Sequence, residues 1–327
     1  MGKQVNTVLG PVDADSLGKT LMHEHFIFSF PGFATDLTLA PYNYAGALEK
    51  GISVANRAKS HGVKTIVDVT PNECARDPLL LKEISEKTGI NIICVTGCYF
   101  ESSGAPAYWN FRALIGDAVQ EIQDMFVAEY TQGIENTGIK AGLIKIGSSK
   151  GVITDYEKLV FKAAARASRE TGALIMTHTE RGTMGVEQAD LLIAEGADPE
   201  RIIIGHMCGA TDIRYELDVL QRGVNIGFDR WGYESPLWGT PLDTDREAMM
   251  AALFARGYIE KMFFSHDSVN FGRSRPPKTP PTTPPADSPV NVGRLFEVLI
   301  PRFKAMGITD AQMEQVLVKN PARIFNL

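Results

Sequence analysis

Short apolar runs alternate with longer amphipathic stretches along the sequence, a pattern typical of repeated strand and helix units around a parallel sheet. Helices are predicted at 44–60, 155–171 and 245–257, several of them after Asp or Thr caps. Eight strands with helical crossovers favour a closed (β/α)8 barrel over the alternative, an open doubly wound α/β sheet. No G-x-G-x-x-G turn follows any run, which weighs against the open sheet. The predicted strands are residues 19–23, 65–69, 92–96, 142–146, 174–178, 202–206, 224–228 and 261–265.

Length and charge restrict the domain organisation and the partners. A chain of 327 residues with 44% hydrophobic content can bury a large core, so we expect residues 1–327 to form a single barrel domain. The net charge of -6 includes no basic run, which argues against nucleic acid and membrane surfaces as partners and favours a small neutral ligand. No apolar run approaches the ~20 residues that span a bilayer, and the residues before the first predicted strand lack the basic stretch and apolar run typical of a signal peptide. We expect a cytoplasmic protein.

Two further features carry weaker expectations. The four cysteines are too few for a disulfide framework, so we expect reduced structural thiols. The proline-rich stretch 273–289, RSRPPKTPPTTPPADSP, cannot continue a helix or strand and is predicted as an extended loop after the eighth strand. It is either a linker or a stiff wall of the active site, because loops after barrel strands build the site.

Histidines concentrate at the carboxyl ends of the predicted strands, where barrel enzymes carry their chemistry. His23 and His25 flank Glu24, and the strand period of two aims both imidazoles to the same side. His61 lies at the end of a predicted helix and is expected to be an ordinary C-terminal cation. The histidines predicted at strand ends are five of the six in the chain: His23, His25, His178, His206 and His266.

The same alternation orients two of these histidines. In LIMTHT it places His178 on the face of Met176, and in RIIIGH it places His206 on the face of Ile202 and Ile204. His178 and His206 are therefore predicted to face one centre. Together with the H-E-H pair, they predict a metal site at the rim of the barrel.

Lys145 lies inside the predicted strand GLIKIG, where a buried ammonium group would be costly unless paired or altered. A neutral amine there can react with carbon dioxide, and the resulting carbamate has two anionic oxygens that can bridge two cations. A snorkelling lysine or a salt bridge is the alternative.

The motif FFSHD ends the eighth predicted strand with His266 and Asp267, whose side chains point to opposite sides. Only one of them can enter the site, and spacing alone does not decide which. A carboxylate would complete a mixed nitrogen and oxygen shell suited to zinc, and could also accept a proton from bridging water.

The motifs TLMHEH, GVKTIVDVT, AGLIKI, THT, IGH, GFDRWG, FFSHD and NPARIF run nearly from end to end of the chain. With them the sequence resembles the phosphotriesterase family, and more closely its phosphotriesterase-like lactonases. The resemblance implies a homodimer and two divalent metal ions, zinc first and cobalt, iron or manganese next. It implies that Asp267, rather than His266, is a ligand. The implied ligands are His23, His25 and Asp267 for the more buried metal, His178 and His206 for the more exposed one, and carboxylated Lys145 as the bridge.

Residues of the substrate pocket also carry over from the resemblance. Tyr99 in TGCYF and Arg230 in FDRWG are similar to those of the lactonase members, which favours lactones as substrates. The segment 231–244 is short, as in the lactonases, and its apolar residues are either acyl-chain contacts or plain loop packing. The candidates for substrate contact are Trp231, Tyr233, Leu237, Trp238 and, after the eighth strand, Phe271.

One departure from the family pattern concerns proton release. Family members usually carry an aspartate about three residues after the histidine of IGH, but here the run is HMCGATD, with Gly209 or Ala210 in that place. Either Asp212 replaces the missing relay, or Asp267 discharges its proton directly to solvent.

The resemblance implies a hydrolase that opens lactones, such as N-acyl-homoserine lactones, through attack of a metal-bridging hydroxide. Asp267 would act as acid and base, and Tyr99 and Arg230 would orient the substrate. Promiscuous hydrolysis of organophosphate triesters is expected beside it. The alternatives are a phosphotriesterase, an amidase acting on small acylated amines and, more remotely, a non-catalytic binding barrel.

Overall fold

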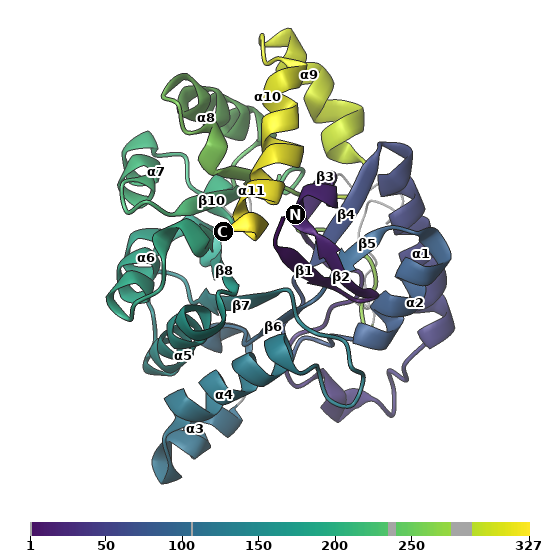
Figure 1. The fold of residues 1–327 in the computed structure, drawn as a ribbon, viewed down its shortest axis with the longest axis vertical. Coiled ribbons are helices and arrows are strands. Elements are labelled where there is room, and N and C mark those ends of the chain that lie inside the picture. Colours follow the sequence, from purple (N-terminus) through teal and green to yellow (C-terminus); the bar gives the residue numbers. More distant parts are fainter. Residues whose placement is uncertain (1, 106, 235–239, 276–289) are drawn as a thin grey trace.

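The computed structural model describes residues 2–105, 107–234, 240–275 and 290–327. Its parallel strands form two sheets, of order β3-β4-β5 and β11-β10-β9-β8-β7-β6, that follow one another around a barrel (Figure 1). The strands are β3 (Lys19–Glu24), β4 (Val63–Asp68), β5 (Asn91–Ile93), β6 (Val95–Gly97), β7 (Leu143–Ser148), β8 (Leu174–Thr179), β9 (Ile202–Ile204), β10 (Asn225–Phe228) and β11 (Met262–Phe264). The predicted (β/α)8 barrel is confirmed.

The ring of strands closes at two junctions. The predicted strand 92–96 is interrupted at Cys94, whose carbonyl accepts a hydrogen bond from Gly142 N at 2.8 Å, so β5 and β6 share one position in the barrel. On the other side, Asp267 N donates to His23 O and His25 N donates to Ser268 O, both at 3.0 Å. This second junction brings the H-E-H and S-H-D motifs together.

Helices surround the strands, as the alternating sequence pattern predicts (Figure 1). Two of them have the predicted bounds, and α8 begins and ends two residues earlier than predicted. The helices are α1 (Tyr44–Ser60), α2 (Pro78–Thr88), α3 (Ala107–Ile115), α4 (Ala118–Thr131), α5 (Asp155–Thr171), α6 (Gly185–Ala194), α7 (Ile213–Leu220), α8 (Asp243–Ala255), α9 (Ile300–Ala305), α10 (Asp310–Glu314) and α11 (Asn320–Asn326). In the part of the chain described, no helix is long and apolar enough to cross a membrane.

An antiparallel hairpin that the sequence pattern did not predict covers the amino-terminal end of the barrel. It consists of β1 (Gln4–Thr7) and β2 (Gly10–Asp13). Val5 of the hairpin and Phe325 of α11 pack in the same cluster as the barrel interior, and both chain ends lie near the centre of Figure 1. Because the hairpin covers this end of the barrel, we expect the active site at the other end, where the strands have their carboxyl ends.

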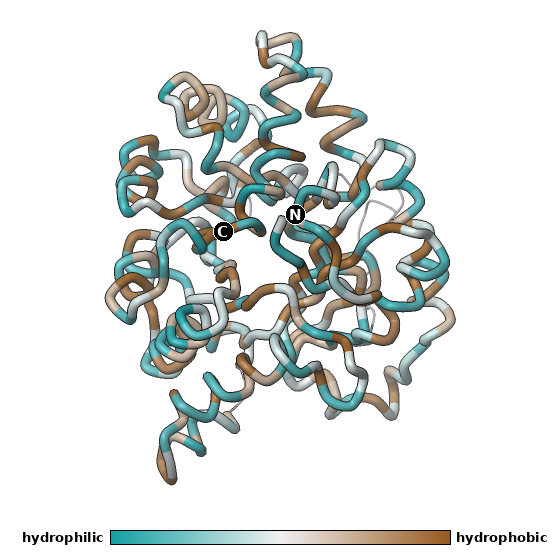
Figure 2. The backbone as a smooth tube through the Cα atoms, in the orientation of Figure 1, coloured by the Kyte–Doolittle hydropathy of each residue, from teal (hydrophilic) through white to brown (hydrophobic). Residues whose placement is uncertain are grey.

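Apolar side chains form two layers, one inside the barrel and one between strands and helices, and the tube in Figure 2 is correspondingly apolar along many strand segments. Met176 of β8 and Ile203 of β9 lie in the inner cluster, whereas Ile202 and Ile204 lie in the outer one. The prediction that His206 shares the face of Ile202 and Ile204 is therefore wrong. Alternation along β9 continues, but with the opposite phase.

Glu216 of α7 is a buried carboxyl group without a counterion. It is 0% exposed, and neither of its oxygens has a hydrogen-bond partner among the described residues. Burial raises the pKa of Glu216 well above its ordinary value of 4.5. The native protein keeps this proton at a pH where the unfolded chain has lost it. The free energy of unfolding should therefore fall as the pH rises above 4.5.

We expect Glu216→Met to raise the free energy of unfolding by about 1–3 kcal/mol at pH 8, because it removes a buried polar group that no partner satisfies. The gain should be smaller at pH 5, where the unfolded chain also begins to bind the proton. Urea unfolding at both pH values measures the difference. Glu187→Met, at an exposed position of α6, is the control. Equal gains at both pH values would contradict this account of Glu216.

Candidate active site

A cavity of about 140 Å³ lies at the carboxyl ends of the barrel strands. Imidazoles, a carboxylate, a lysine and a guanidinium group converge on it from β3, β7, β8 and the segments that follow β6, β10 and β11. The cavity is lined by His23, His25, Phe28, Phe30, Tyr99, Lys145, His178, Arg230, Tyr233, Asp267 and Val269. Phe28, Phe30 and Val269 were not among the residues predicted from the sequence.

Two of the histidines reach this region through local breaks in the strand geometry. Met22 packs inside the barrel, yet the next residue, His23, also lines the cavity. The register between β3 and β4 shifts between Leu21 and Glu24, and such an irregularity re-aims a side chain. His206 follows the end of β9 with a left-handed φ of 61°, which turns its ring toward His23, with the two ring centroids 4.6 Å apart.

The Asp267 carboxylate lies among the histidine Nε2 atoms. Its Oδ1 is 3.3 Å from His23 Nε2 and 3.1 Å from His25 Nε2, and its Oδ2 is 3.7 Å from His206 Nε2. These side chains are buried, and His206 Nε2 has no hydrogen-bond partner among the described residues. Converging imidazole nitrogens and a carboxylate oxygen fit a borderline cation such as zinc. The donor set therefore fits the implied metals.

Outer hydrogen bonds fix the orientation of three imidazoles. Asp229 accepts from His23 Nδ1 through Oδ2 at 2.9 Å and from His206 Nδ1 through Oδ1 at 2.8 Å, while Thr70 Oγ1 lies 2.7 Å from His25 Nδ1. Because the Thr70 hydroxyl donates to Ile27 O, it accepts from His25. In all three rings Nδ1 therefore has an outer partner, and Nε2 is the nitrogen directed at Asp267 and the metal position, as is usual for ligating histidines.

Asp229 is a functional candidate that the sequence reasoning missed. Burial opposes its ionisation, but His206 and His23 hold the pKa of Asp229 well below its ordinary value. Since both of its oxygens face Nδ1 atoms, Asp229 orients the rings rather than joining the Nε2 donors. Its position at the end of β10, in GFDRWG, was the available signal.

Lys145 enters the cavity from the middle of β7 and is 1% exposed. Its Nζ donates to Thr177 O at 3.1 Å and lies 3.5 Å from His23 Nε2. Burial lowers the pKa of Lys145 to about 8, although Asp229 and Asp267 act in the opposite direction. About one-tenth of the amine is therefore neutral at pH 7, far more than for an ordinary lysine, and the neutral amine is the form that reacts with carbon dioxide.

Arg230 and two tyrosines form the polar wall of the cavity beside Asp267. Arg230 Nε donates to Asp267 Oδ2 at 2.8 Å, and Tyr233 Oη donates to Asp267 O at 3.1 Å. Burial opposes the charge of Asp267, but His206 and Arg230 hold its pKa well below the ordinary value. Tyr99 contacts the His178 ring edge-on, with the two centroids 5.7 Å apart. Asp267 is thus an ionised carboxylate beside groups that can orient a substrate.

The choice between His266 and Asp267, which spacing left open, follows from a buried network. His266 Nδ1 donates to Glu24 Oε1 at 2.7 Å, and His266 Nε2 accepts from Leu295 N at 3.1 Å. Both ring nitrogens of His266 therefore have hydrogen-bond partners outside the cavity. Glu24 also accepts hydrogen bonds from Ser265 and Ser268, so it ties the end of β3 to the segment after β11. Asp267, with a φ of 55°, faces the cavity.

Other predicted pocket residues lie elsewhere or cannot be placed. Trp231 is fully buried and packs against Phe264 and Phe303, with ring centroids 5.6 Å and 5.2 Å away, so it belongs to the core rather than to the cavity. Phe271 is partly buried against the outer core and is not part of the cavity lining. Leu237, Trp238 and residues 276–289 of the proline-rich stretch lie outside the described residues.

The two candidates for proton release differ in position. Asp212 is exposed, and its side chain caps α7 by accepting from Arg214 N at 2.9 Å. It does not line the cavity. This geometry favours Asp267 itself, which lies in the cavity wall, as the group that exchanges protons with solvent.

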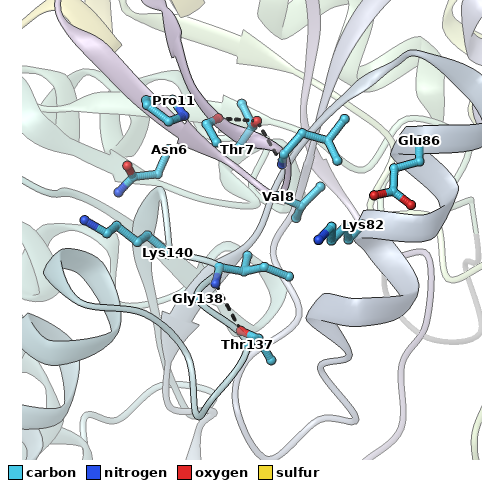
Figure 3. A pocket seen from close by; sticks show the side chains of 12 residues that line it. Asn6, Thr7, Val8, Pro11, Lys82, Glu86, Thr137, Gly138 and Lys140 are labelled. Atoms are coloured by element: carbon cyan, nitrogen blue, oxygen red, sulfur yellow. Dashed lines mark hydrogen bonds between the residues drawn. The ribbon is translucent and has the colours of Figure 1, made fainter.

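A second cavity, of about 510 Å³, lies beside the amino-terminal hairpin at the opposite end of the barrel, and Figure 3 shows the side chains that line it. Asn6 and Pro11 of the amino-terminal hairpin, Lys82 and Glu86 of α2, and Lys140 before β7 line it. Its described lining contains no histidine, cysteine or aspartate. It offers nothing comparable to the cluster at the carboxyl ends.

Imidazoles, a buried lysine and a carboxylate at the carboxyl rim of a (β/α)8 barrel define the class of metal-dependent hydrolases. A model of the phosphotriesterase family matches residues 3–325. A phosphotriesterase homology protein of Mycobacterium tuberculosis is 32% identical, over 98% of this chain and 97% of that protein. An aryldialkylphosphatase of Saccharolobus solfataricus is 31% identical, over 96% and 97% of the two chains.

A solved structure gives a higher similarity. A mutant phosphotriesterase-like lactonase of Deinococcus radiodurans has a TM-score of 0.94 and 46% identity, over 98% of this chain and 99% of that one. The chain belongs to the phosphotriesterase family. It is accordingly a metal-dependent ester hydrolase, and the alternative of a non-catalytic binding barrel is excluded.

Proposed function

We propose that the protein hydrolyses lactones, including N-acyl-homoserine lactones, and hydrolyses organophosphate triesters as a weaker side activity. The observation that carries the proposal is the placement of Arg230, Tyr99 and Tyr233 around the Asp267 carboxylate in a small cavity. A cavity of about 140 Å³ has room for a compact ring rather than for three bulky ester arms. The lactonase from Deinococcus radiodurans, at 46% identity, supports the same substrate class.

His23, His25 and Asp267 would hold one divalent cation, His178 and His206 would hold the other, and carboxylated Lys145 would join them. When bound, two zinc ions would lower the pKa of a water molecule and polarise the substrate carbonyl. Cobalt, iron or manganese would supply the same chemistry. Asp229 and Thr70 keep three imidazole rings in the tautomer that leaves Nε2 available.

The chain's own groups account for substrate positioning and proton transfer. Arg230 and Tyr99 line the cavity and can donate hydrogen bonds to the ring oxygen and the carbonyl oxygen of the lactone. Asp267 would accept a proton at Oδ2, the oxygen to which Arg230 Nε donates at 2.8 Å. It would then return this proton to the leaving alkoxide. The leaving alkoxide would otherwise depart as a strong base.

Matched substrates test the proposal. A homoserine lactone with a short acyl chain, a diethyl aryl phosphotriester and an N-acyl amine should be compared with the purified, zinc-loaded enzyme. We expect the lactone to have a kcat/KM at least about 10-fold above the other two, equivalent to about 1.4 kcal/mol of transition-state binding. A phosphotriester or an amide that exceeded the lactone would assign the enzyme to one of the two alternatives, a phosphotriesterase or an amidase.

Arg230 and Tyr99 should determine substrate choice rather than metal content, because neither belongs to the proposed donor set. We expect Tyr99→Phe and Arg230→Met to lower lactone kcat/KM about 10–100-fold, the cost of about 1.4–2.7 kcal/mol of lost hydrogen bonding. Elemental analysis should still find two zinc ions per chain. Loss of zinc from Tyr99→Phe would place that phenol against a metal instead.

We further propose that residues 1–327 form one cytoplasmic domain that assembles into a homodimer. Lys3 N donates to Asn326 Oδ1 at 2.8 Å, which joins the two ends of the chain. The four cysteines are buried and free, as expected in a reducing compartment.

The homodimer is proposed from helix α3, which projects from the barrel and has no buried residue (Figures 1 and 2). Its exposed apolar side chains suit a second copy. Leu114→Asp should lower the mass measured by light scattering.

A further inference from the structure

His178 differs from the other three imidazoles in the ring nitrogen that faces an outer partner, meaning a group outside the proposed metal ligands. His23, His25 and His206 are held through Nδ1. His178 is held through Nε2, which lies 3.1 Å from Glu180 Oε2. No group among the described residues hydrogen-bonds to His178 Nδ1, and the ring lines the cavity. The binding edge of His178 is therefore Nδ1.

The His178 ring is fixed in two independent ways. Phe100 stacks on it with a centroid distance of 4.5 Å and an interplanar angle of 23°, which defines the plane of the ring. Stacking alone would still permit the ring to flip by half a turn about its Cβ–Cγ bond. Such a flip keeps the plane of the ring but exchanges its two edges. A carboxylate only accepts hydrogen bonds, so the contact with Glu180 places the proton on Nε2 and leaves the Nδ1 lone pair for the cavity.

Glu180 is itself held in place by the loop after β8. Its carbonyl accepts hydrogen bonds from Thr183 N at 3.2 Å and from Thr183 Oγ1 at 2.8 Å. Arg181, the next residue, has a left-handed φ of 56°. Its side-chain Nε lies 3.9 Å from Glu180 Oε1. The backbone thus turns sharply at the position that keeps the Glu180 carboxylate beside His178.

We propose that Glu180 is a positioning residue, which selects the Nε2–H tautomer of His178 and so makes Nδ1 its metal-binding atom. The inference rests on the proposed metal centre. It gives His178 the same kind of outer partner that Asp229 supplies to His23 and His206. Glu180 would then affect the ion held by His178 and His206 more than the ion held by His23 and His25.

Zinc binding tests the proposal without relying on turnover. The metal-free protein is titrated with zinc against a chromophoric chelator, and the two affinities are compared among wild type, Glu180→Ala and Glu180→Gln. We expect Glu180→Ala to lower the affinity for one of the two zinc ions about 10–100-fold, because removal of an outer partner typically has an effect of this size. Glu180→Gln should restore most of the affinity, because its amide oxygen still accepts from Nε2–H. Glu187→Ala, exposed on α6, should behave as wild type.

The cobalt-loaded proteins supply a second measurement, since the visible absorption of cobalt reports the ligands around it. Glu180→Ala should change one part of that spectrum, and Glu180→Gln should not. Wild-type affinity in Glu180→Ala would overturn the proposal. Equal losses in Glu180→Gln and Glu180→Ala would also overturn it, because the carboxylate charge would then matter rather than its hydrogen bond. A wild-type protein that binds no zinc would overturn the proposed function as well.

Discussion

Lys145→Ala is expected to lose most of the bound metal and to lower lactone hydrolysis by more than about 100-fold. Loss of an outer partner already costs 10–100-fold in metal affinity, and Lys145 is proposed as the bridge itself. Without it, neutral imidazoles and one carboxylate remain to balance two dications. The alanine also removes the only amine that lines the cavity among the described residues. The barrel itself should remain folded.

Elemental analysis and turnover measure the effect of Lys145→Ala on the same preparation. Lys140→Ala, at the opposite end of the barrel, is the matched control and should keep both metal ions. A short carboxylate such as formate or acetate should partly restore the activity of Lys145→Ala by occupying the space of the carbamate. Full metal content and full turnover in Lys145→Ala would show that the carbamate assignment is wrong.

Asp267→Asn should separate lactones from aryl phosphotriesters. An aliphatic alkoxide is nearly as basic as hydroxide, whose parent water has a pKa of ~15.7, so ring opening needs a proton donor. An aryl leaving group departs as a stabilised anion and needs no such help. The asparagine keeps a ligand oxygen but cannot carry the proton. We expect the lactone rate to fall roughly 10²–10⁴-fold and the phosphotriester rate to fall less.

The two rates for Asp267→Asn should be measured on enzyme that is shown to retain both metals. Asp212→Asn, which alters only the exposed cap of α7, is the matched control and should leave both rates unchanged. Equal losses on both substrates would make Asp267 a ligand only. A large loss in Asp212→Asn would instead identify Asp212 as the relay.

The barrel was predictable because each of its units is encoded locally. The helices α1 and α5 have the predicted bounds, since caps and apolar periodicity lie within each segment. The hairpin of β1 and β2 was not predicted, because its strands are short and one of its faces packs under the barrel interior. The break at Cys94 depends on its pairing with Gly142, which lies far away in the sequence.

The site was predictable where alternation holds and not where the backbone leaves the strand. Lys145 and His178 follow Leu143 and Met176 on the inner face, as a period of two requires. His206 reaches the cavity region through its left-handed φ, so the phase predicted for β9 was wrong. The alternation of apolar residues along β9 does not predict this left-handed turn at His206.

Apart from Glu180, which lies two residues from His178, the outer partners could not be derived from spacing, because they join segments that are distant in sequence. Asp229 contacts His23 from 206 residues away, and Glu24 contacts His266 from 242 residues away. Only closure of the barrel brings these groups together. The core position of Trp231 has the same origin, since its neighbours Phe264 and Phe303 come from other strands and helices.

The most direct test of the central claim is a stepwise titration of the metal-free enzyme with zinc while lactone opening is followed. The proposed centre predicts little activity after one equivalent per chain and a plateau at two equivalents, with Lys145→Ala showing no such plateau. Full activity at one equivalent, or no lactone opening at any zinc ratio, would contradict a binuclear lactonase.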